Sequence, residues 1–396
     1  MKIAYIIHNE TPDSGLLNTQ VFNLLSELSV SNKLNITLYA IWQPVIFIRD
    51  FAKIRKLKNR LSKVGVNLVS IPFALPGRYF FKNEVLLEIN TLFTTFVMSL
   101  FSMNRYDVVH CRGYFITSIM TKLKKKFKLI FDMRSMFPEE NVSSGNWNEF
   151  SPIYNKWKII EEINIRNSEA TVAVSQPMAT SLKENYSLES IYYIPIGFDF
   201  ESESHCSDLN LKKLLGIEEK FIVGYCGSLE LGFWNDISIY SEYFKGINSS
   251  ISNAHFLLLT GSNHLTISNY LKNQGVDNFT LLSLKYSDVP KYLQICDCGI
   301  QVMSRHLDSS TRFGVKTVEY WAAGIPVLTN SNVGGACYFM KGKPFLGAVV
   351  NSSSSFDYSL LEKREMFNSD EIRKLAVNEF SFKNVSKLYN SLYQTI

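Results

Sequence analysis

One segment of the C-terminal half carries residues that could bind an anion. Residues 309–311 are Ser-Ser-Thr, which are helix-capping types, and Gly314 would let a ligand approach the backbone closely. Lys316 and Glu319 lie three residues apart, so they would share one face of a helix. The start of a helix directs unpaired N–H groups and the positive end of its dipole at one point. The segment therefore predicts a phosphate-binding loop and helix.

The surrounding sequence predicts the elements that would hold this segment. Residues 315–323 have helical periodicity, Gly324 ends the helix, and residues 325–329 form a short apolar strand. Similar apolar runs alternate with helical stretches from residue 2 to 194 and again from 221 to 329. This alternation predicts an α/β protein with parallel, doubly wound sheets.

A polar stretch at residues 199–210 interrupts the alternation, and 396 residues suit two domains. We expect an N-terminal Rossmann-like domain over 1–198, a linker over 199–210, a second such domain over 211–379 and a closing helix over 380–396. In that last helix the pattern places Val385, Leu388 and Leu392 on one face.

Composition and charge narrow the class of protein. The chain is 46% hydrophobic and 19% charged, as expected of a globular protein. Residues 1–195 hold 23 Lys/Arg against 16 Asp/Glu (+7), and the rest hold 18 against 20 (−2). The basic half indicates an anionic partner, unless the asymmetry is chance. The six cysteines lack metal-ligand spacing and no signal peptide is evident, so we expect a cytoplasmic protein.

The segment 309–330 resembles the signature of glycosyltransferase family 4, the retaining nucleotide-sugar transferases of the GT-B fold. Phe313-Gly314, Glu319 and the Ala-Gly-Ile-Pro-Val of residues 323–327 match the signature. Thr311 departs from it, because the family usually has a Glu there that contacts the donor sugar. Weaker similarities occur along the chain, at 14–15, 107–110, 174–175, 194–199, 224–228 and 380–382. The resemblance implies two facing domains with a cleft between them.

The resemblance also implies roles for individual residues. Glu319 would accept hydrogen bonds from the donor ribose, Lys316 would meet the diphosphate, and His110 would orient the sugar from a strand end. Arg112 and Arg134, which follow neighbouring strands, are expected to bind acceptor or phosphate. Further donor contacts are expected from Gly15, Gly227, Ser228, Arg305, Thr311, Arg312, Gly314 and Tyr320. Two cations that family members commonly carry are replaced by Ser228 and Phe233.

Plainer roles fit the same residues. Lys316 and Glu319 could form a surface ion pair, and His110 could be a structural histidine. Each arginine could be a loop residue paired with Glu139 or Glu140.

Residues 49–63 form a basic amphipathic pattern, with seven cations, one acid, and Phe51, Ile54, Leu57 and Leu61 on one face. This pattern fits docking on anionic lipid, and it equally fits an ordinary domain helix with a wet outer face. The longest apolar run, 85–103, is interrupted by Glu88, Asn90 and three threonines, so it does not predict a membrane span.

The sequence thus predicts a hexosyltransferase that moves a sugar from a nucleotide donor to a glycan or lipid-linked acceptor with retention, in bacterial surface polysaccharide synthesis. We expect no metal, because no Asp-x-Asp pair occurs in the sequence. We also expect no cofactor and no nucleic-acid partner. Two alternative functions are a GT-B nucleotide-sugar epimerase and an inactive sugar-nucleotide-binding partner. The first loop lacks Gly-x-Gly-x-x-Gly, which disfavours an NAD oxidoreductase.

Overall fold

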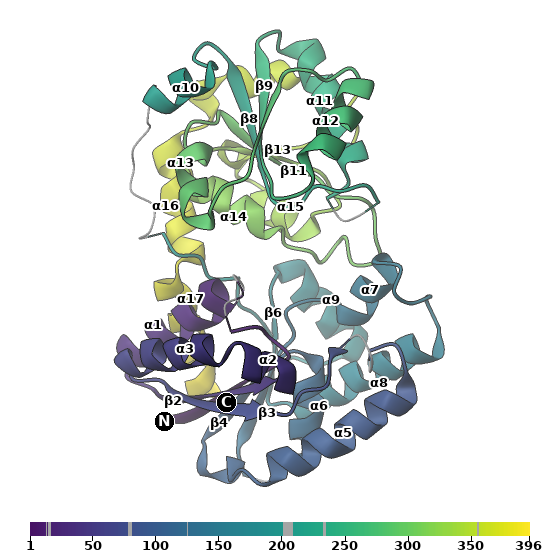
Figure 1. The fold of residues 1–396 in the computed structure, drawn as a ribbon, viewed down its shortest axis with the longest axis vertical. Helices are drawn as coiled ribbons and strands as arrows, with labels where there is room; N and C mark the ends of the chain where they lie inside the picture. The colour runs from purple at the N-terminus through teal and green to yellow at the C-terminus, as the bar shows by residue number, and fades with distance from the viewer. Residues whose placement is uncertain are drawn as a thin grey trace. The chain divides into compact units, whose positions relative to one another are not determined.

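The computed structural model describes residues 1–12, 14, 17–77, 81–124, 126–200, 209–232, 235–354 and 356–396. The chain divides into two compact units (Figure 1). Met1–Phe198 and Phe382–Ile396 form the N-terminal unit, and Asp199–Ser381 form the C-terminal unit.

The N-terminal unit is built on a parallel sheet, of which the described residues form seven strands in the order β3-β2-β1-β4-β5-β6-β7. The strands are β1 (Lys2–His8), β2 (Asn35–Trp42), β3 (Asn67–Pro72), β4 (Val108–Arg112), β5 (Lys128–Asp132), β6 (Ala170–Ala173) and β7 (Ile191–Tyr193). The strand order reverses between β1 and β4. In doubly wound sheets, ligands bind at such a switch point, beyond the carboxyl ends of the strands.

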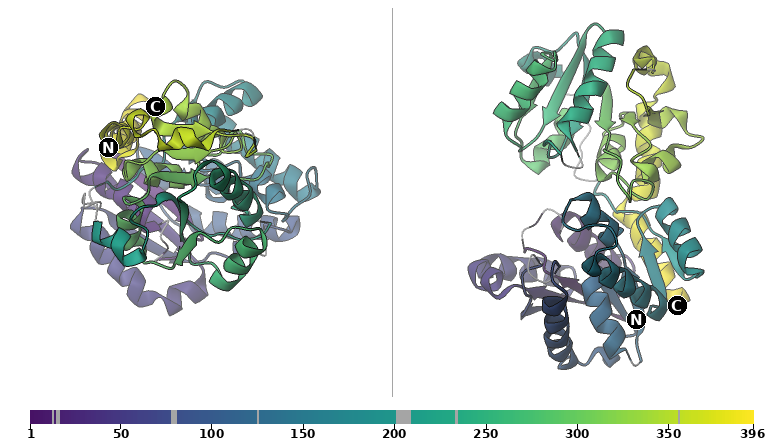
Figure 2. Two further views of the ribbon diagram at one scale, coloured as in Figure 1. Left: turned by 90° about the horizontal axis from the view of Figure 1, so that it is seen from above. Right: turned by 90° about the vertical axis from the view of Figure 1, so that its right-hand side faces the viewer.

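Helices cover both faces of this sheet (Figure 2). One face carries α1 (Asn23–Val30), α3 (Phe51–Lys63) and α17 (Phe382–Thr395). The other carries α5 (Glu84–Ser99), α6 (Tyr114–Leu123), α8 (Pro152–Asn167) and α9 (Gln176–Tyr186). Shorter helices are η1 (Leu17–Phe22), α2 (Pro44–Arg49), η2 (Met103–Arg105) and α7 (Phe137–Ser143).

The last helix, α17, returns to the N-terminal sheet. Val385 and Leu392 pack in the same core as β1, whereas Leu388, which the pattern placed on the same face, is 39% exposed. Gly197 allows this return, because a Cβ atom there would lie 2.4 Å from the Phe382 ring. Close packing of this segment therefore requires glycine at position 197.

The C-terminal unit repeats the architecture with a parallel sheet of six described strands in the order β10-β9-β8-β11-β12-β13. They are β8 (Phe221–Cys226), β9 (Ala254–Leu259), β10 (Phe279–Leu282), β11 (Cys298–Gln301), β12 (Val327–Thr329) and β13 (Gly347–Val349). The sequence pattern did not predict β13, because Gly347 and Ala348 give this short strand little apolar signal. The predicted doubly wound α/β fold is confirmed.

The described residues of this unit form seven α-helices: α10 (Leu209–Leu215), α11 (Ile237–Ser250), α12 (His264–Asn273), α13 (Val289–Leu293), α14 (Val315–Ala322), α15 (Gly334–Met340) and α16 (Ser369–Phe380). Four short 3-10 turns are η3 (Tyr286–Asp288), η4 (Pro344–Leu346), η5 (Tyr358–Glu362) and η6 (Arg364–Met366). Helices α11 and α12 pack on one side of the sheet. No helix among the described residues is long and apolar enough to cross a bilayer.

Candidate functional site

The C-terminal unit brings the end of β8 next to α14. Gly227 follows β8 with φ +140°, a conformation that favours glycine, and its N–H donates to the Leu259 carbonyl at 3.0 Å. A Cβ atom at position 227 would lie 3.7 Å from Cε of Lys316. The loop after β8 and the first turn of α14 therefore border the same small region.

Lys316 and Glu319 form an ion pair in this region. The Lys316 Nζ donates to both carboxylate oxygens of Glu319 at 3.0 Å. The Glu319 side chain is only 6% exposed, whereas that of Lys316 is 31% exposed. The acid is therefore part of a built site, which excludes a surface ion pair on an open helix face.

Two further groups hold the carboxylate of Glu319. The Cys226 thiol donates to Oε2 at 3.2 Å, and the Tyr286 hydroxyl lies 3.5 Å from Oε1. Burial alone would lower the pKa of Lys316, but the neighbouring Cys226 and Glu319 groups outweigh burial and raise it above its usual value. Lys316 is thus a permanent cation with part of its surface open.

The first turn of α14 lies close to the neighbouring strand. Its N-cap is Gly314, and a Cβ atom there would lie 3.0 Å from Cγ of Gln301 and 3.1 Å from Cγ1 of Val333. Gly314 has no side chain to cap the helix. The expected capping by residues 309–311 is wrong, since the Thr311 hydroxyl donates to the Asp308 carbonyl at 2.9 Å in the preceding turn.

The other predicted donor residues are distributed around this helix start. The Arg312 Nε bonds to Asp308 at 2.6 Å, which orients its guanidinium along the loop, and Arg305 is exposed. Ser228 is exposed, and its carbonyl accepts from the Tyr225 hydroxyl. Gly15 and Phe233 lie outside the described residues.

Tyr320 does not contact the site. Its side chain is fully buried, and its hydroxyl accepts from the Cys226 N–H at 3.1 Å and donates to the Ile300 carbonyl at 3.1 Å. The predicted donor contact is therefore corrected: the hydroxyl joins β8 to β11 inside the unit and fixes where β8 ends.

His110 also lies inside a core, in the N-terminal unit. It is fully buried, with Nδ1 2.8 Å from the Tyr393 hydroxyl and Nε2 3.5 Å from Asp132. Burial lowers its pKa, although Asp132 acts in the opposite direction. The expected contact with sugar is therefore corrected: His110 is a structural histidine that ties β4 to α17.

Arg112 and Arg134 converge beyond the ends of β4 and β5. Both donate to Oε1 of Gln20, at 2.8 and 3.0 Å, and both flank Asp132, at 4.0 and 3.6 Å. Burial would raise the pKa of Asp132, but Arg134, His110 and Arg112 outweigh burial and lower it to about 2. Asp132 therefore stays charged and holds the two guanidinium groups together.

The alternative pairing of these arginines with Glu139 or Glu140 does not occur. Glu139 pairs with Lys158 at 2.9 Å, and Glu140 accepts from Ser135 at 2.7 Å. Arg112 and Arg134 instead line a cavity of about 220 Å³. Its lining also includes His8 and Glu10 on the polar side and the rings of Phe81, Phe115, Phe137 and Trp157 on the other.

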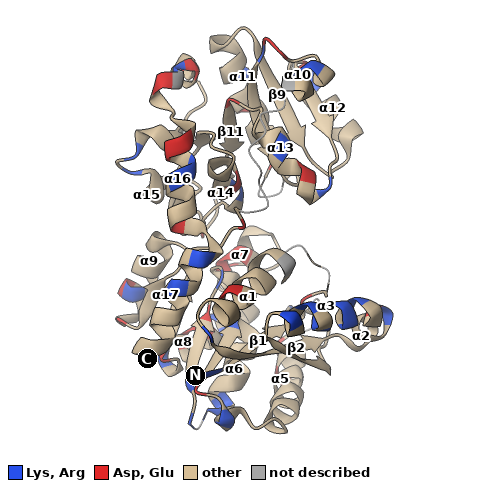
Figure 3. Ribbon diagram, turned by 90° about the vertical axis from the view of Figure 1, so that its left-hand side faces the viewer, with Lys and Arg blue, Asp and Glu red and all other residues tan. Residues whose placement is uncertain are grey.

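Helix α3 holds the basic segment, whose apolar face is not available for docking. Ile54, Leu57 and Leu61 are buried against the sheet, whereas Phe51 is exposed. The apolar face of α3 therefore belongs to the domain core, as in an ordinary domain helix, and docking on anionic lipid through its outer face stays a prediction. Its cationic outer face is on the surface, visible as a row of Lys and Arg in Figure 3.

Three residues of these sites were not predicted from the sequence. Cys226 and Tyr286 are ordinary core and loop types, and only the meeting of β8, α14 and η3 reveals them. Asp132 is the last residue of β5, and the Asp-x-Arg motif that it forms with Arg134 was the available signal.

Comparisons with known proteins identify a related family and similar folds. The family model described as Glycosyltransferase Family 4 matches residues 63–202, about a third of the chain. No curated protein sequence matches significantly. Among solved structures, Anabaena HepE in complex with UDP is 14% identical with a TM-score of 0.69, covering 100% of both chains. The same protein has also been solved with UDP-glucose.

Two other glycosyltransferase structures extend the comparison. Sucrose-phosphate synthase from Thermosynechococcus elongatus is 13% identical with a TM-score of 0.68, covering 100% of this chain and 98% of that one. WaaG, a glycosyltransferase involved in lipopolysaccharide biosynthesis, is 14% identical with a TM-score of 0.65, covering 99% of both. These similarities establish the fold. The fold is that of GT-B glycosyltransferases, and residues 63–202 are similar to the Glycosyltransferase Family 4 model.

Proposed function

We propose that this protein is a retaining hexosyltransferase that moves a sugar from a nucleotide donor to a glycan or lipid-linked acceptor. The observation that carries the proposal is the buried Glu319 paired with the half-open Lys316 at the start of α14. Glu319, which three neighbouring side chains hold in place, suits the ribose hydroxyls of a nucleotide, and the partly exposed Lys316 suits its diphosphate.

The donor site uses these groups in distinct ways. The Glu319 carboxylate would accept hydrogen bonds from the ribose hydroxyls, and Lys316 would leave part of its pairing to meet the diphosphate. Gly227 and Gly314 keep side chains away from the phosphates. We propose a uridine nucleotide, since HepE has been solved with UDP and UDP-glucose.

The reaction places charge where the protein can stabilise it. Breaking the sugar–phosphate bond leaves negative charge on the diphosphate oxygen and positive charge on the sugar ring. Lys316 and the N–H groups at the start of α14 would stabilise the leaving diphosphate, which makes the transferase independent of metal in this proposal. The leaving phosphate would accept the proton of the acceptor hydroxyl on the same face of the sugar, which gives retention.

The acceptor side would be the N-terminal unit. Arg112 and Arg134 present two guanidinium groups at the switch point of the sheet, which suits an acceptor that carries phosphate or carboxylate. Arg134→Gln should raise the KM for the acceptor and leave the KM for the donor unchanged. An unchanged acceptor KM would remove this assignment.

We place the protein in surface polysaccharide synthesis, in the cytoplasm and at the inner face of the membrane. WaaG acts in lipopolysaccharide biosynthesis, and the cationic face of α3 suits an anionic surface.

A second candidate is an inactive sugar-nucleotide-binding protein. Thr311, where the family usually has a Glu, is buried and donates to the Asp308 carbonyl, so no carboxylate is offered to the donor sugar at this position. Such a protein would bind the nucleotide without transfer.

Thermal unfolding with nucleotides tests both candidates. UDP and UDP-sugars should raise the Tm of the wild type, and turnover assays with the tightest donor and candidate acceptors follow. Binding without turnover favours the inactive partner, and turnover of donor without any acceptor favours an epimerase. If no nucleoside diphosphate raises the Tm, the donor site proposed here does not exist.

A further inference from the structure

Helix α5 exposes apolar side chains and buries several polar ones, the reverse of an ordinary surface helix. Its outward side chains are apolar and expose between 38% and 70% of their surface: Val85, Leu86, Ile89, Leu92, Phe93 and Phe96, followed by Leu100 at its C-cap. Its buried side chains include Asn90, Thr91 and Thr94. At 100° per residue, the apolar set covers an arc of about 120°.

The two inward threonine hydroxyls form hydrogen bonds within the helix, whereas Nδ2 of the buried Asn90 has no hydrogen-bond partner among the described residues. The Thr91 hydroxyl donates to the Leu87 carbonyl at 2.7 Å, and that of Thr94 donates to the Asn90 side chain at 3.4 Å. Asn90, Thr91 and Thr94 are three of the five residues that interrupt the apolar run in the sequence. A fourth, Glu88, is exposed beside the apolar arc and pairs with Lys156. Most of the interruption therefore belongs to the buried side, and the outward arc itself is apolar.

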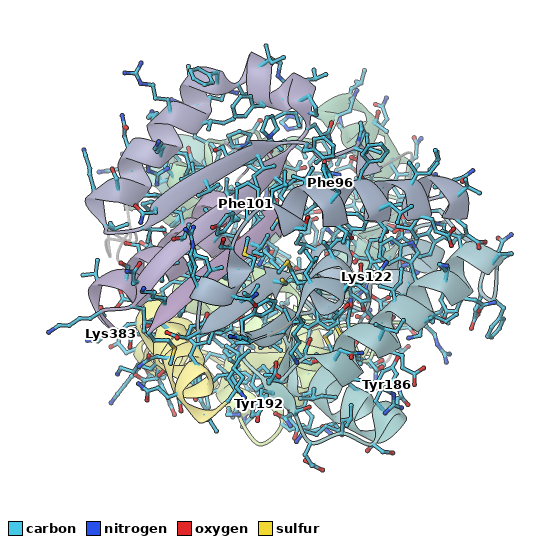
Figure 4. All side chains as sticks on the ribbon, turned by 90° about the horizontal axis from the view of Figure 1, so that it is seen from below. Phe96, Phe101, Lys122, Tyr186, Tyr192 and Lys383 are labelled. Atoms are coloured by element: carbon cyan, nitrogen blue, oxygen red, sulfur yellow. The ribbon has the colours of Figure 1, made fainter. Side chains whose placement is uncertain are left out.

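The apolar surface extends beyond α5. Phe73, after β3, is partly exposed and lies 6.2 Å from Phe93, ring to ring. On the other flank, Leu92 lines a groove of about 380 Å³ with Ile159 and Ile163 of α8. Figure 4 shows the unit from below, with Phe96 on α5 and Lys122 beside this groove labelled. We call the outward residues of α5 with Phe73, Ile159 and Ile163 the α5 face.

Cations flank the α5 face. Lys122, Lys156 and Glu88 line the groove, where Lys156 pairs with Glu88 at 2.8 Å, and Lys82 is exposed just before α5. Helix α3 has six Lys/Arg and no acid, all exposed, and packs beside β3 from the opposite side of the sheet. Since β3 is the edge strand, the α5 face and the cations of α3 border the same edge.

We infer that the α5 face is where this protein binds a bilayer of anionic lipids, with the aromatic rings of α5 entering the headgroup region and the cations of α3 meeting the lipid phosphates. An exposed apolar area of this extent requires a partner. A bilayer supplies an apolar layer and a negatively charged plane together, which is the combination that α5 and α3 offer. The inference deepens the proposed function, since a surface-bound transferase would meet a lipid-linked acceptor.

Vesicle sedimentation tests the inference. Wild-type protein should sediment with vesicles of phosphatidylglycerol and phosphatidylcholine and not with phosphatidylcholine alone. Phe93→Ser/Phe96→Ser should lower the bound-to-free ratio at least about tenfold, because two large apolar contacts are lost. The matched control is Leu214→Ser/Leu265→Ser, which changes two exposed leucines of the C-terminal unit and should bind as the wild type does.

A second pair of variants separates charge from apolar contact. Lys56→Glu/Lys58→Glu on α3 should weaken binding mainly at low salt, whereas Lys272→Glu/Lys374→Glu on α12 and α16 should not. Each variant should keep the wild-type Tm and its shift with UDP, which shows that folding and donor binding are intact.

Three results would overturn the inference. The first is that the wild-type protein stays in the supernatant with anionic vesicles, and the second is that Phe93→Ser/Phe96→Ser binds the vesicles as well as the wild type does. The third is that light scattering finds a dimer of the wild type that this variant dissociates, which would assign the α5 face to a second copy. Failure of UDP binding with intact vesicle binding would instead count against the proposed donor site alone.

Discussion

The Lys316 ammonium lies 3.0 Å from both oxygens of the Glu319 carboxylate, one turn apart on α14, with the acid buried and the lysine partly open. The pair is asymmetric: Cys226 and Tyr286 also hold the acid, so it is a fixed acceptor, while the cation can turn toward a ligand. This division suits a ligand that has hydroxyls on one side and phosphates on the other.

Removing the charge of Glu319 should weaken the donor site. We expect Glu319→Gln to lower UDP affinity roughly tenfold to a hundredfold, because a charged hydrogen-bond acceptor is worth about 1.5–3 kcal/mol. Titration calorimetry with UDP measures the change. Glu242→Gln, an exposed acid on α11, is the control and should bind as the wild type does. Equal affinity in both variants would show that Glu319 only supports the fold.

Removing the charge of Lys316 should distinguish phosphate from nucleoside. We expect Lys316→Met to lose about tenfold or more in UDP affinity and to keep the affinity for uridine, because the ammonium would meet only the diphosphate. Competition titrations with UDP and uridine measure both, with Lys272→Met on α12 as the control. A parallel loss for the two ligands would argue that Lys316 acts through the structure and makes no phosphate contact.

His110 should contribute to stability and not to chemistry. We expect His110→Ala to cost about 2–4 kcal/mol, because it leaves a cavity and removes the bond to Tyr393. Tyr393→Phe, which removes only the hydroxyl, should cost about 1 kcal/mol. Denaturant titration gives these values, and kcat is measured where each variant is folded. A loss of kcat without a loss of stability would return His110 to the catalytic machinery.

The buried histidines should make the protein sensitive to mild acid. Burial lowers the pKa of His8 to about 3 and also lowers that of His110, whereas both would protonate near pH 6.5 in the unfolded chain. The unfolded state therefore binds more protons below pH 6.5. The free energy of unfolding should fall by up to about 1.4 kcal/mol per pH unit for each such histidine as pH drops from 7 to 5.

Denaturant titrations at several pH values measure this slope. His8→Asn should reduce the slope, because it removes one buried imidazole. A stability that stays level or rises between pH 7 and 5 would contradict the expected burial of neutral imidazoles.

The sequence by itself determined the fold class and the local elements of the C-terminal site. The apolar periods predicted all the described strands of the N-terminal unit, and the residues around Gly314 placed Lys316 and Glu319 on one helix face, because local spacing fixes neighbours within a helix.

Only the tertiary structure decided which side chains face ligand and which face core. His110 lies near the end of β4 but is buried, because α17 covers it. Tyr320 lies in the family motif but is also buried, because its hydroxyl bonds to β8 and β11 inside the unit. The apolar outward face of α5 could not be predicted from the sequence for the same reason. The linear sequence shows Asn90 and the threonines as interruptions of an apolar run and does not show that Asn90, Thr91 and Thr94 point inward. Burial depends on contacts between residues far apart in the chain, such as His110 and Tyr393, and no local pattern encodes those contacts.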